Sequence, residues 1–217
     1  AVAIARLLAA MLPDAVVNSV QPRPTEAKML RDGRLAIGRI ESKGRRVGTL
    51  VPGSDLVLLQ HNPMMVTLFK EAFPKASSRI RQFPRLGFSG YHPDMMTLDK
   101  RVASGTGEYH SSIAIYGWRR GLTVAQTVAL FEEEVFDSLG FFEYWNSGVQ
   151  YLTEAGAAAG LPLDRLIKQW TAKGVWMHTF NHPKLPVVAD LARALLEREG
   201  IAFIPDVEQS VADNLED

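Results

Sequence analysis

The sequence predicts an α/β protein with a short central sheet in its N-terminal half and a mostly helical C-terminal half. Two observations on the pattern lead to this class. Short β-branched and apolar runs separated by turns gather before residue 90, and four segments with helical spacing follow residue 120. The composition agrees, since 47% of the 217 residues are hydrophobic and 22% are charged, as in globular proteins. A chain of this length fits one domain spanning residues 1–217.

The N-terminal half alternates predicted strands and helices. A first helix places Ile4, Leu7 and Met11 on one face and is stopped by Pro13. Pro63 suits the first position of a later helix. The expected helices cover residues 1–12, 25–31 and 63–73. The expected strands cover residues 15–20, 35–40, 47–51, 55–60 and 79–83.

The C-terminal half reads as a series of helices separated by glycines. A helix over 109–118 is expected directly after the loop 104–107. Thr123 and Gln126 have the spacing of a capping box, which predicts a helix over 123–139. Three further helices are expected over 142–159, 162–171 and 185–199. Gly140, Gly160, Gly174 and Gly200 stand where these helices should end.

Charge and cysteine content exclude several kinds of protein. The 24 Lys and Arg residues balance 24 Asp and Glu residues, so nothing favours a nucleic-acid partner. The absence of cysteine excludes disulfides, thiolate metal ligands and a cysteine nucleophile within these residues. No apolar run is long enough to span a bilayer, and residues 1–12 lack the basic start of a secretory signal. A cytoplasmic location is therefore expected.

All five histidines lie in or beside polar, turn-like segments. They are His61, His92, His110, His178 and His182. Loops carry functional residues more often than regular elements do, which favours a site. The alternative is that histidines simply occur in loops and caps.

A zinc site is a weak interpretation of the same residues. His178 and His182 are four apart, the spacing that aligns two ligands on a helix. However, Pro183 follows directly and disfavours helical geometry at His182. Asp94 is an available carboxylate, but no acidic residue lies between the two histidines. No metal is predicted.

Two segments are candidates for holding an anion. The glycine loop that ends at Gly107 precedes a predicted helix start with His110 and Ser111, where free amide groups would bind phosphate. The alternative is an ordinary flexible loop. Arg79 and Arg81 belong to a basic stretch that would hold phosphates. The alternative there, and the favoured one, is a solvated edge strand.

The histidines also suit acyl transfer, because a general base must have a pKa near neutrality. His110 or His182 would be the base. Asn181 would supply a hydrogen-bond donor to a developing oxyanion, and Asp94 would orient an imidazole.

Several strings, in this order, resemble the WcbI family of capsule polysaccharide biosynthesis enzymes. They are Phe-Pro at 83–84, Gly-Tyr-His-Pro-Asp at 90–94, Tyr-His-Ser at 109–111, Gly-Leu at 121–122 with an acidic helix after it, and Met-His-Thr-Phe-Asn-His-Pro-Lys at 177–184. The resemblance covers roughly residues 1–202. It implies a bacterial protein with a cradle-like α/β fold and a deep pocket for coenzyme A or acetyl-CoA.

The resemblance also implies the acetylation of a capsular or exopolysaccharide sugar. The residues expected to contact the coenzyme are Tyr91, His92, Gly107, Tyr109, Ser111, Arg79, Arg81, His178 and Lys184. Such proteins typically open with a strand that ends in Gly-Asn-Cys-Gln, and this string is absent here. We therefore expect either that the chain is a fragment that starts after the string, or that this member lacks it.

Three functions stay open from the sequence. They are a coenzyme A-dependent O-acetyltransferase, an esterase that removes acyl groups from glycans or small esters, and a noncatalytic coenzyme-binding module that assists a partner enzyme. An oligomer is possible, because a dimer surface or a sugar platform could be formed by the aromatic residues Trp118, Phe141, Phe142, Tyr144 and Trp145. Their spacing favours core packing.

Overall fold

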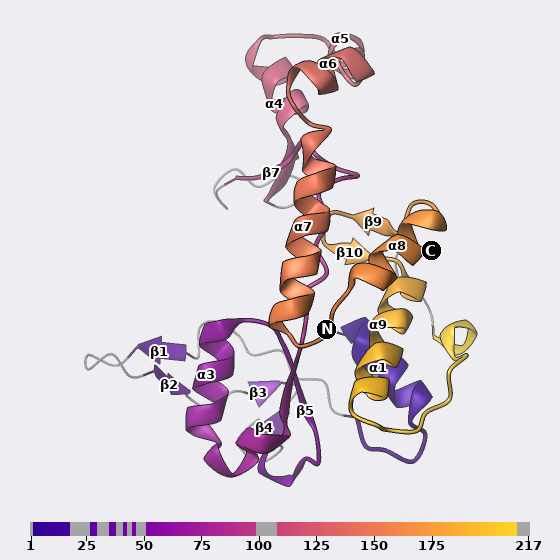
Figure 1. Cartoon of the computed structure of the whole chain (residues 1–217). Helices are drawn as coiled ribbons and strands as arrows, with labels where there is room; N and C mark the ends of the chain where they lie inside the picture. Colours follow the sequence, from indigo (N-terminus) through magenta and orange to yellow (C-terminus); the bar gives the residue numbers. More distant parts are fainter. Residues whose placement is uncertain are drawn as a thin grey trace. The chain divides into compact units, whose positions relative to one another are not determined.

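The computed structural model describes residues 2–17, 27–29, 35–37, 41–42, 45–46, 51–98 and 108–211. Its helices are α1 (Val2–Met11), α3 (Pro63–Ala72), α4 (Ser112–Arg119), α5 (Val124–Val128), α6 (Glu133–Ser138), α7 (Glu143–Ala158), α8 (Asp164–Ala172) and α9 (Leu185–Arg198). Three 3-10 helices are η2 (Val51–Gly53), η3 (Pro74–Arg79) and η5 (Glu208–Ser210). Figure 1 labels the α-helices, and its colours follow the chain from the N-terminus to the C-terminus.

The strands of the described residues form five separate two-stranded pairs. Four pairs are antiparallel: β1 (Ala27–Met29) with β2 (Leu35–Ile37), β3 (Glu41–Ser42) with β4 (Arg45–Arg46), β7 (Met95–Thr97) with β8 (Tyr109–Ser111), and β9 (Met177–Thr179) with β10 (His182–Pro183). The fifth pair, β5 (Val57–Gln60) with β6 (Ile80–Phe83), is parallel. The predicted mixed α/β class, with mostly helical C-terminal residues, is confirmed. The strands are short pairs where one central sheet was expected.

The chain divides into two compact units. Unit 1 comprises residues 1–85, 153–166 and 184–217, and unit 2 comprises residues 86–152 and 167–183. Two of their four boundaries fall inside α7 and α8, and the other two follow β6 and β10.

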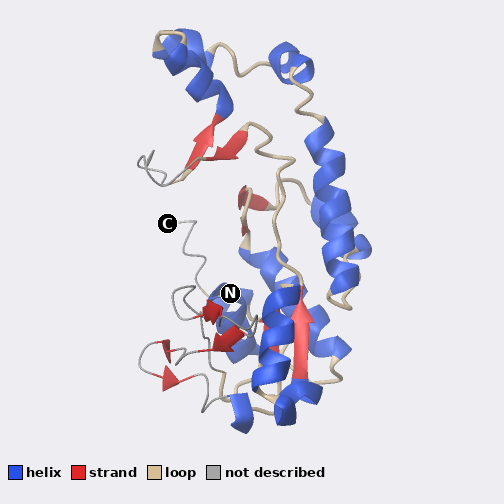
Figure 2. Ribbon diagram, turned by 90° about the vertical axis from the view of Figure 1, so that its left-hand side faces the viewer, coloured by secondary structure: helices blue, strands red, loops and turns tan. Residues whose placement is uncertain are grey.

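Unit 1 is built around two helix contacts. Helices α1 and α9 pack against each other, and their apolar stripes are buried, with Leu7 at 0% exposure and Leu196 at 1%. This stripe on α1 is the one that the sequence predicts. A second cluster joins Phe69 of α3 to Ile80 of β6, so that the helix between the parallel strands covers them. Figure 2 shows this strand pair among the helices of unit 1.

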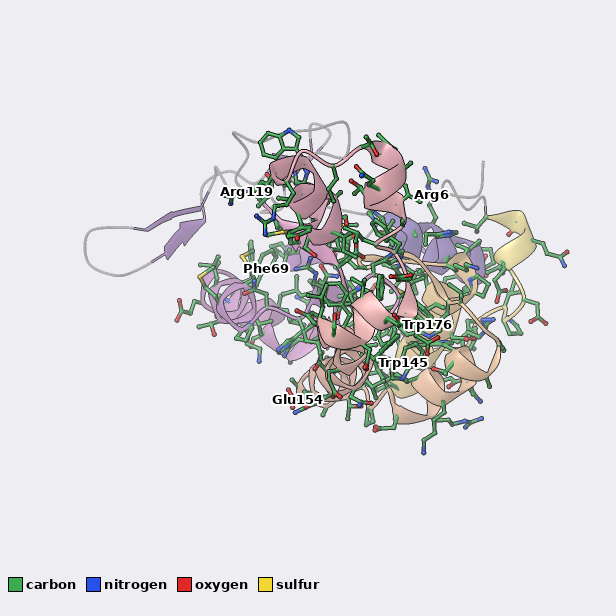
Figure 3. All side chains as sticks on the ribbon, turned by 90° about the horizontal axis from the view of Figure 1, so that it is seen from above. Arg6, Phe69, Arg119, Trp145, Glu154 and Trp176 are labelled. Carbon is green, nitrogen blue, oxygen red and sulfur yellow. The ribbon has the colours of Figure 1, made fainter. Side chains whose placement is uncertain are left out.

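The core of unit 2 is a cluster of aromatic rings. Phe88 is 1% exposed, and its ring centroid lies 5.2 Å from Tyr91, 5.0 Å from Trp145 and 4.6 Å from Trp176. Trp145 and Trp176 are labelled in Figure 3. A Cβ atom at Gly148 would lie 2.9 Å from the Phe88 ring, so this turn of α7 requires a residue without a side chain.

Most predicted helices are confirmed; two exceptions follow here, and the third, over residues 109–118, is described with the candidate site. Residues 27–29, expected to be helical, form β1, because they pair with β2. The helix expected over 123–139 is divided into α5 and α6. Helix α6 begins with Glu133 and Glu134 in its first turn, and acidic side chains are stabilised at a helix N-terminus. The acidic residues at this point therefore favour the start of a new helix, α6, and not the continuation of α5.

Two of the expected strands, over residues 15–20 and 47–51, are not strands where the structure describes them. Residues 15–17 are not in a strand and 18–20 lie outside the described residues. Val51 belongs to η2, and residues 47–50 also lie outside the described part of the chain. None of the helices in the described ranges is both long and apolar enough to cross a membrane.

Candidate functional site

Two hairpins of unit 2 carry most of the predicted site residues. In the first, β8 pairs with β7 so that His110 lies opposite Met96 and Tyr109 lies opposite Thr97. The pairing ends at Ser111, whose hydroxyl accepts from the Ala114 amide at 3.2 Å and caps α4. A serine at this position stabilises a helix start.

This geometry corrects the prediction for residues 109–118. Tyr109, His110 and Ser111 are extended, and the helix begins only at Ser112. The strand continues because β7 supplies a pairing partner, and the Ser112 amide donates to the Asp94 carbonyl at 2.8 Å. His110 and Ser111 are therefore not first-turn helical side chains. The glycine loop 104–107, with Gly107, lies outside the described residues.

The second hairpin has a two-residue loop, Phe180-Asn181. Thr179 and His182 are direct partners across this loop. Directly opposed residues of an antiparallel pair have Cβ atoms roughly 5 Å apart, so their side chains meet. The hairpin is held in unit 2 by the Phe88 amide, which donates to the Phe180 carbonyl at 2.7 Å. The ring of Phe180 lies 4.9 Å from that of Tyr109, which joins the two hairpins.

Four polar side chains form a continuous hydrogen-bonded chain across the two hairpins. Asn181 Nδ2 donates to the Tyr109 hydroxyl at 3.3 Å. The Thr179 hydroxyl donates to Asn181 Oδ1 at 3.0 Å. The same hydroxyl lies 2.7 Å from His182 Nδ1. We call this set, Tyr109, Asn181, Thr179 and His182, the polar relay.

With the Asn181 amide placed so that its Oδ1 faces the Thr179 hydroxyl, these bonds assign one tautomer to His182. A hydroxyl has one hydrogen to donate, and Thr179 donates it to Asn181. Its contact with His182 therefore requires the ring Nδ1–H as the donor. The neutral imidazole then keeps its lone pair on Nε2, since the bond at one ring nitrogen determines the state of the other. His182 is exposed, and an Nε2 lone pair within reach of a bound molecule is what a general base requires.

Thr179 is the residue that sequence reasoning missed. The imidazole of His182 contacts the Thr179 hydroxyl, and the orientation of an imidazole by Asp94 stays a prediction. A signal was present, because polar residues at positions 179, 181 and 182 surround a two-residue hairpin loop. A hairpin over residues 177–184 with a two-residue loop at 180–181 places Thr179 opposite His182.

Tyr91 lies in the aromatic core of unit 2. Its hydroxyl donates to the Gly174 carbonyl at 3.1 Å. Burial raises the pKa of Tyr91 above its usual value of 10.0, and a backbone hydrogen bond with Trp176 opposes this only in part. Tyr91 is therefore a neutral phenol that packs the cluster. His92, half-buried in the following turn, and His178, half-buried on β9, belong to the same unit.

Arg79, Arg81 and Lys184 belong to unit 1. Arg79 donates to the carbonyls of Ser54 at 2.7 Å and Pro52 at 3.2 Å. Arg81 Nε donates to Glu199 at 2.8 Å. The structure thus gives both arginines partners within the protein, and their predicted contact with coenzyme phosphates stays a prediction. Lys184 is the N-cap residue of α9.

The histidine pair has no helical alignment. His178 is on β9 and His182 on β10, so the four-residue spacing does not place them on a helix face. Within the described ranges, no group of three or more His, Asp or Glu residues is arranged to hold a metal ion.

Comparisons with known proteins agree on one family. The family model described as the polysaccharide biosynthesis enzyme WcbI matches residues 54–203. A solved structure of WcbI, a polysaccharide biosynthesis enzyme in a native form without a disulfide bond between coenzyme A and a cysteine, has the same fold. It matches with a TM-score of 0.56 and 18% identity over 72% of this chain. The match spans 56% of that protein's chain.

A comparison with curated proteins finds no match. The family match covers more than half of the chain and includes both hairpins of the polar relay. This protein belongs to the WcbI family of polysaccharide biosynthesis enzymes.

Proposed function

We propose that this protein is a coenzyme A-dependent O-acyltransferase that acetylates a sugar hydroxyl in the synthesis of a capsular or exopolysaccharide, with His182 as its general base. The observation that carries the proposal is the 2.7 Å contact between the Thr179 hydroxyl and His182 Nδ1. It leaves Nε2 of a neutral imidazole as the proton acceptor. We place the reaction in the cytoplasm of a bacterium.

Coenzyme A enters the proposal from the WcbI structure, which is described with this molecule. An acetyl thioester supplies an activated acyl group and a good leaving group. The residues of the polar relay suit such a donor, because they provide a base, an amide and two hydroxyl groups without a nucleophile of their own. The chain has no cysteine, so the sulfur described for the neighbour has no counterpart within these 217 residues.

His182 moves one proton in each direction. Nε2 removes the proton of the acceptor hydroxyl as its oxygen forms the new ester bond to the acyl carbon. The carbon–sulfur bond breaks, and the imidazolium returns the proton to the departing thiolate. The acceptor loses one proton and the thiol gains it, so the reaction is balanced. Thr179 accepts the Nδ1–H bond throughout and holds the ring in one orientation.

The other predicted residues have supporting roles in this proposal. Asn181 positions Thr179 and is itself held by Tyr109. His110, on β8 beside Tyr109, is the second candidate for the base. Tyr91, His92, Ser111 and His178, all of unit 2, are proposed to shape the coenzyme contact, and Asp94 to stabilise the turn before β7. The polar relay favours His182 over His110 as the base because its tautomer follows from bonds within the hairpin.

The absence of cysteine allows a direct test. A thiol reagent added to protein and acetyl-CoA reports only the thiol released from the coenzyme, because the protein contributes none. We expect micromolar coenzyme A binding by calorimetry, tighter than that of ATP, and thiol release that depends on a nucleotide sugar or glycoside with a free hydroxyl. His182→Ala should lower the rate about 100- to 10,000-fold with binding retained. His61→Ala, in unit 1, is the matched control and should be near wild type.

Other results would replace this proposal with a different function. Cleavage of a chromogenic acetate without coenzyme would identify an esterase. Coenzyme binding without turnover of any acceptor would identify a binding module. The absence of coenzyme A binding would contradict the proposal that this coenzyme is the acyl donor. Full activity in His182→Ala with loss in His110→Ala would transfer the role of base to His110.

A further inference from the structure

Helices α4, α5 and α6 of unit 2, with the residues up to 144, expose an unusual number of large apolar side chains. Those exposed by 44% or more are Tyr116, Trp118, Val124, Val128, Phe131, Leu139, Phe142 and Tyr144. Trp118 is 79% exposed and Val124 is 82% exposed. We call these eight residues the α4–α6 surface. Figure 1 shows the three short helices beyond the N-terminal end of α7, and large apolar groups of this kind mark interaction sites.

Contacts within the unit show that this surface is continuous. Helices α4 and α5 pack so closely that a Cβ atom on Gly117 would lie 2.3 Å from Thr127 Oγ1. The Phe136 ring of α6 lies 6.4 Å from Phe131 and 6.3 Å from Phe142. Helix α4 thus packs against α5, and Phe131 and Phe142, on the two sides of α6 in the sequence, both contact the Phe136 ring of that helix.

These helices have little internal support. Helix α5 has five residues and α6 has six, and neither contains a buried residue. Helix α4 buries only Ile113 and Gly117. Helices of this length are marginal in water and depend on packing of an apolar face. Apart from the contacts of α4 with α5 and β8, the described residues of the chain leave the large apolar side chains of these helices exposed.

Charges of both signs border the surface. Arg119 and Arg120 follow Trp118, and Glu132, Glu133, Glu134 and Asp137 surround the start of α6. No Lys or Arg occurs between residues 121 and 164. Within the described ranges none of these six charged side chains forms an ion pair with another. The Arg120 guanidinium lies over the ring of Tyr116, with its Cζ atom 5.5 Å from the ring centroid. Arg119 is labelled in Figure 3.

We propose that the α4–α6 surface is covered by the same surface of a second copy of this chain, in a twofold symmetric dimer. A twofold contact places each patch of one copy against the complementary patch of the other. Arg119 and Arg120 of each copy then face Glu133 and Glu134 of its partner, while the aromatic rings form the centre. Arginine and aromatic residues are enriched at such interfaces.

The exposed area agrees with a dimer. Large aromatic side chains carry roughly 150–250 Å² each, so the five aromatic residues, about half exposed, offer on the order of 500 Å². The two valines and the leucine extend this toward the roughly 800 Å² per partner of a stable interface. A purely basic partner would oppose Arg119 and Arg120 with like charge. A second copy offers charges of both signs, so each arginine can face a glutamate.

Sedimentation velocity over a range of protein concentrations tests the proposal. We expect a dimer for wild type and a weakening of at least 10-fold in Trp118→Glu, in R119E/R120E and in E133R/E134R. An equimolar mixture of the two charge-reversed proteins should form a heterodimer, and the combined fourfold variant should dimerise again. K168E/K173E reverses two exposed charges on and after α8, has the same charge change as R119E/R120E, and should remain dimeric.

Circular dichroism of each variant separates loss of association from loss of folding. A monomeric wild type at all concentrations would overturn the proposal, whether or not it bound a basic protein or a glycan. Failure of the charge-reversed mixture to associate, with both proteins folded, would overturn it as well. If K168E/K173E weakened the dimer as much as R119E/R120E, the effect would come from net charge, and the proposed pairing of arginines with glutamates would be rejected.

Discussion

The Thr179 hydroxyl lies 2.7 Å from Nδ1 of His182, across a two-residue hairpin loop. Thr179 also donates to Asn181, so the hydrogen of this contact comes from the histidine ring. A threonine thereby takes the place at His182 that a carboxylate has in many histidine sites. Threonine carries no charge, so it orients the imidazole through this hydrogen bond alone.

Thr179→Val tests this relationship. Valine keeps the shape and removes the acceptor of the Nδ1–H bond, so the ring is free to change tautomer and orientation. We expect about a 10- to 100-fold loss in the rate of acetyl transfer, the usual effect of removing such a partner, with little change in coenzyme affinity. Nitrogen-15 NMR of the imidazole should show the Nδ1–H form in wild type and a mixed population in the variant.

Thr179→Ser is the matched control, since serine retains the hydroxyl and should retain most activity and the wild-type tautomer. A Thr179→Val protein with an unchanged imidazole spectrum would show that the hydroxyl does not determine the tautomer.

The aromatic core of unit 2 predicts a large effect of Phe88→Ala. Phe88 is almost fully buried and contacts three rings, so its removal leaves a cavity that these rigid side chains cannot fill. The free energy of unfolding should fall by about 3–5 kcal/mol in chemical denaturation. Ile204→Ala, at a position that is 49% exposed, should change it by about 0.5 kcal/mol or less. Equal effects of the two would mean that Phe88 is not in a packed core.

Glu199→Gln tests the charged network at the end of α9. The Glu199 side chain is 13% exposed and accepts from Arg81 Nε at 2.8 Å and from Arg198 Nε at 2.7 Å. The glutamine would leave two guanidinium groups without their anion, and we expect a loss of about 1–3 kcal/mol by urea denaturation. Glu197→Gln, on the exposed side of the same helix, is the control and should cost about 0.5 kcal/mol or less.

If Arg81 instead serves coenzyme phosphates, Glu199→Gln should tighten coenzyme A binding, because it frees this arginine. If Arg81 is structural, as its bonds indicate, the affinity should stay near wild type while the free energy of unfolding falls.

The raised pKa of Tyr91 predicts that the free energy of unfolding changes with pH in the alkaline range. Because the folded protein raises the pKa of this phenol, the folded state holds the proton more tightly than the unfolded state. The resulting stabilisation is complete below the usual value of 10.0 and is lost as pH rises through the higher folded pKa. Tyr91→Phe should show a smaller loss of stability above about pH 10 than wild type.

At neutral pH the free energy of unfolding of Tyr91→Phe should be lower by about 0.5–1.5 kcal/mol, because the hydrogen bond to Gly174 is lost. Tyr144→Phe leaves Tyr91 in place and should keep the wild-type alkaline loss. Identical alkaline behaviour of wild type and Tyr91→Phe would contradict the raised pKa.

The sequence was most informative where local rules act alone. Pro63 marked the start of α3, and the capping box of Thr123 and Gln126 is present as predicted. The helices closed by Gly160 and Gly200 end at those glycines, which adopt positive φ angles of 67°. It was least informative in strands, where pairing with a distant segment decides the outcome, as at Ala27–Met29 and Tyr109–Ser111.

By itself, the sequence determined the α/β class, the ends of most helices, the family, and the two strings that hold the candidate site. These depend on periodicity, capping and residue identity, which are local properties of the chain. Only the tertiary structure decided that Thr179 faces His182 and that Asn181 reaches Tyr109, 72 residues away. Cross-strand register and the docking of hairpins are set by packing between distant segments, and a linear pattern does not encode which side chains then meet.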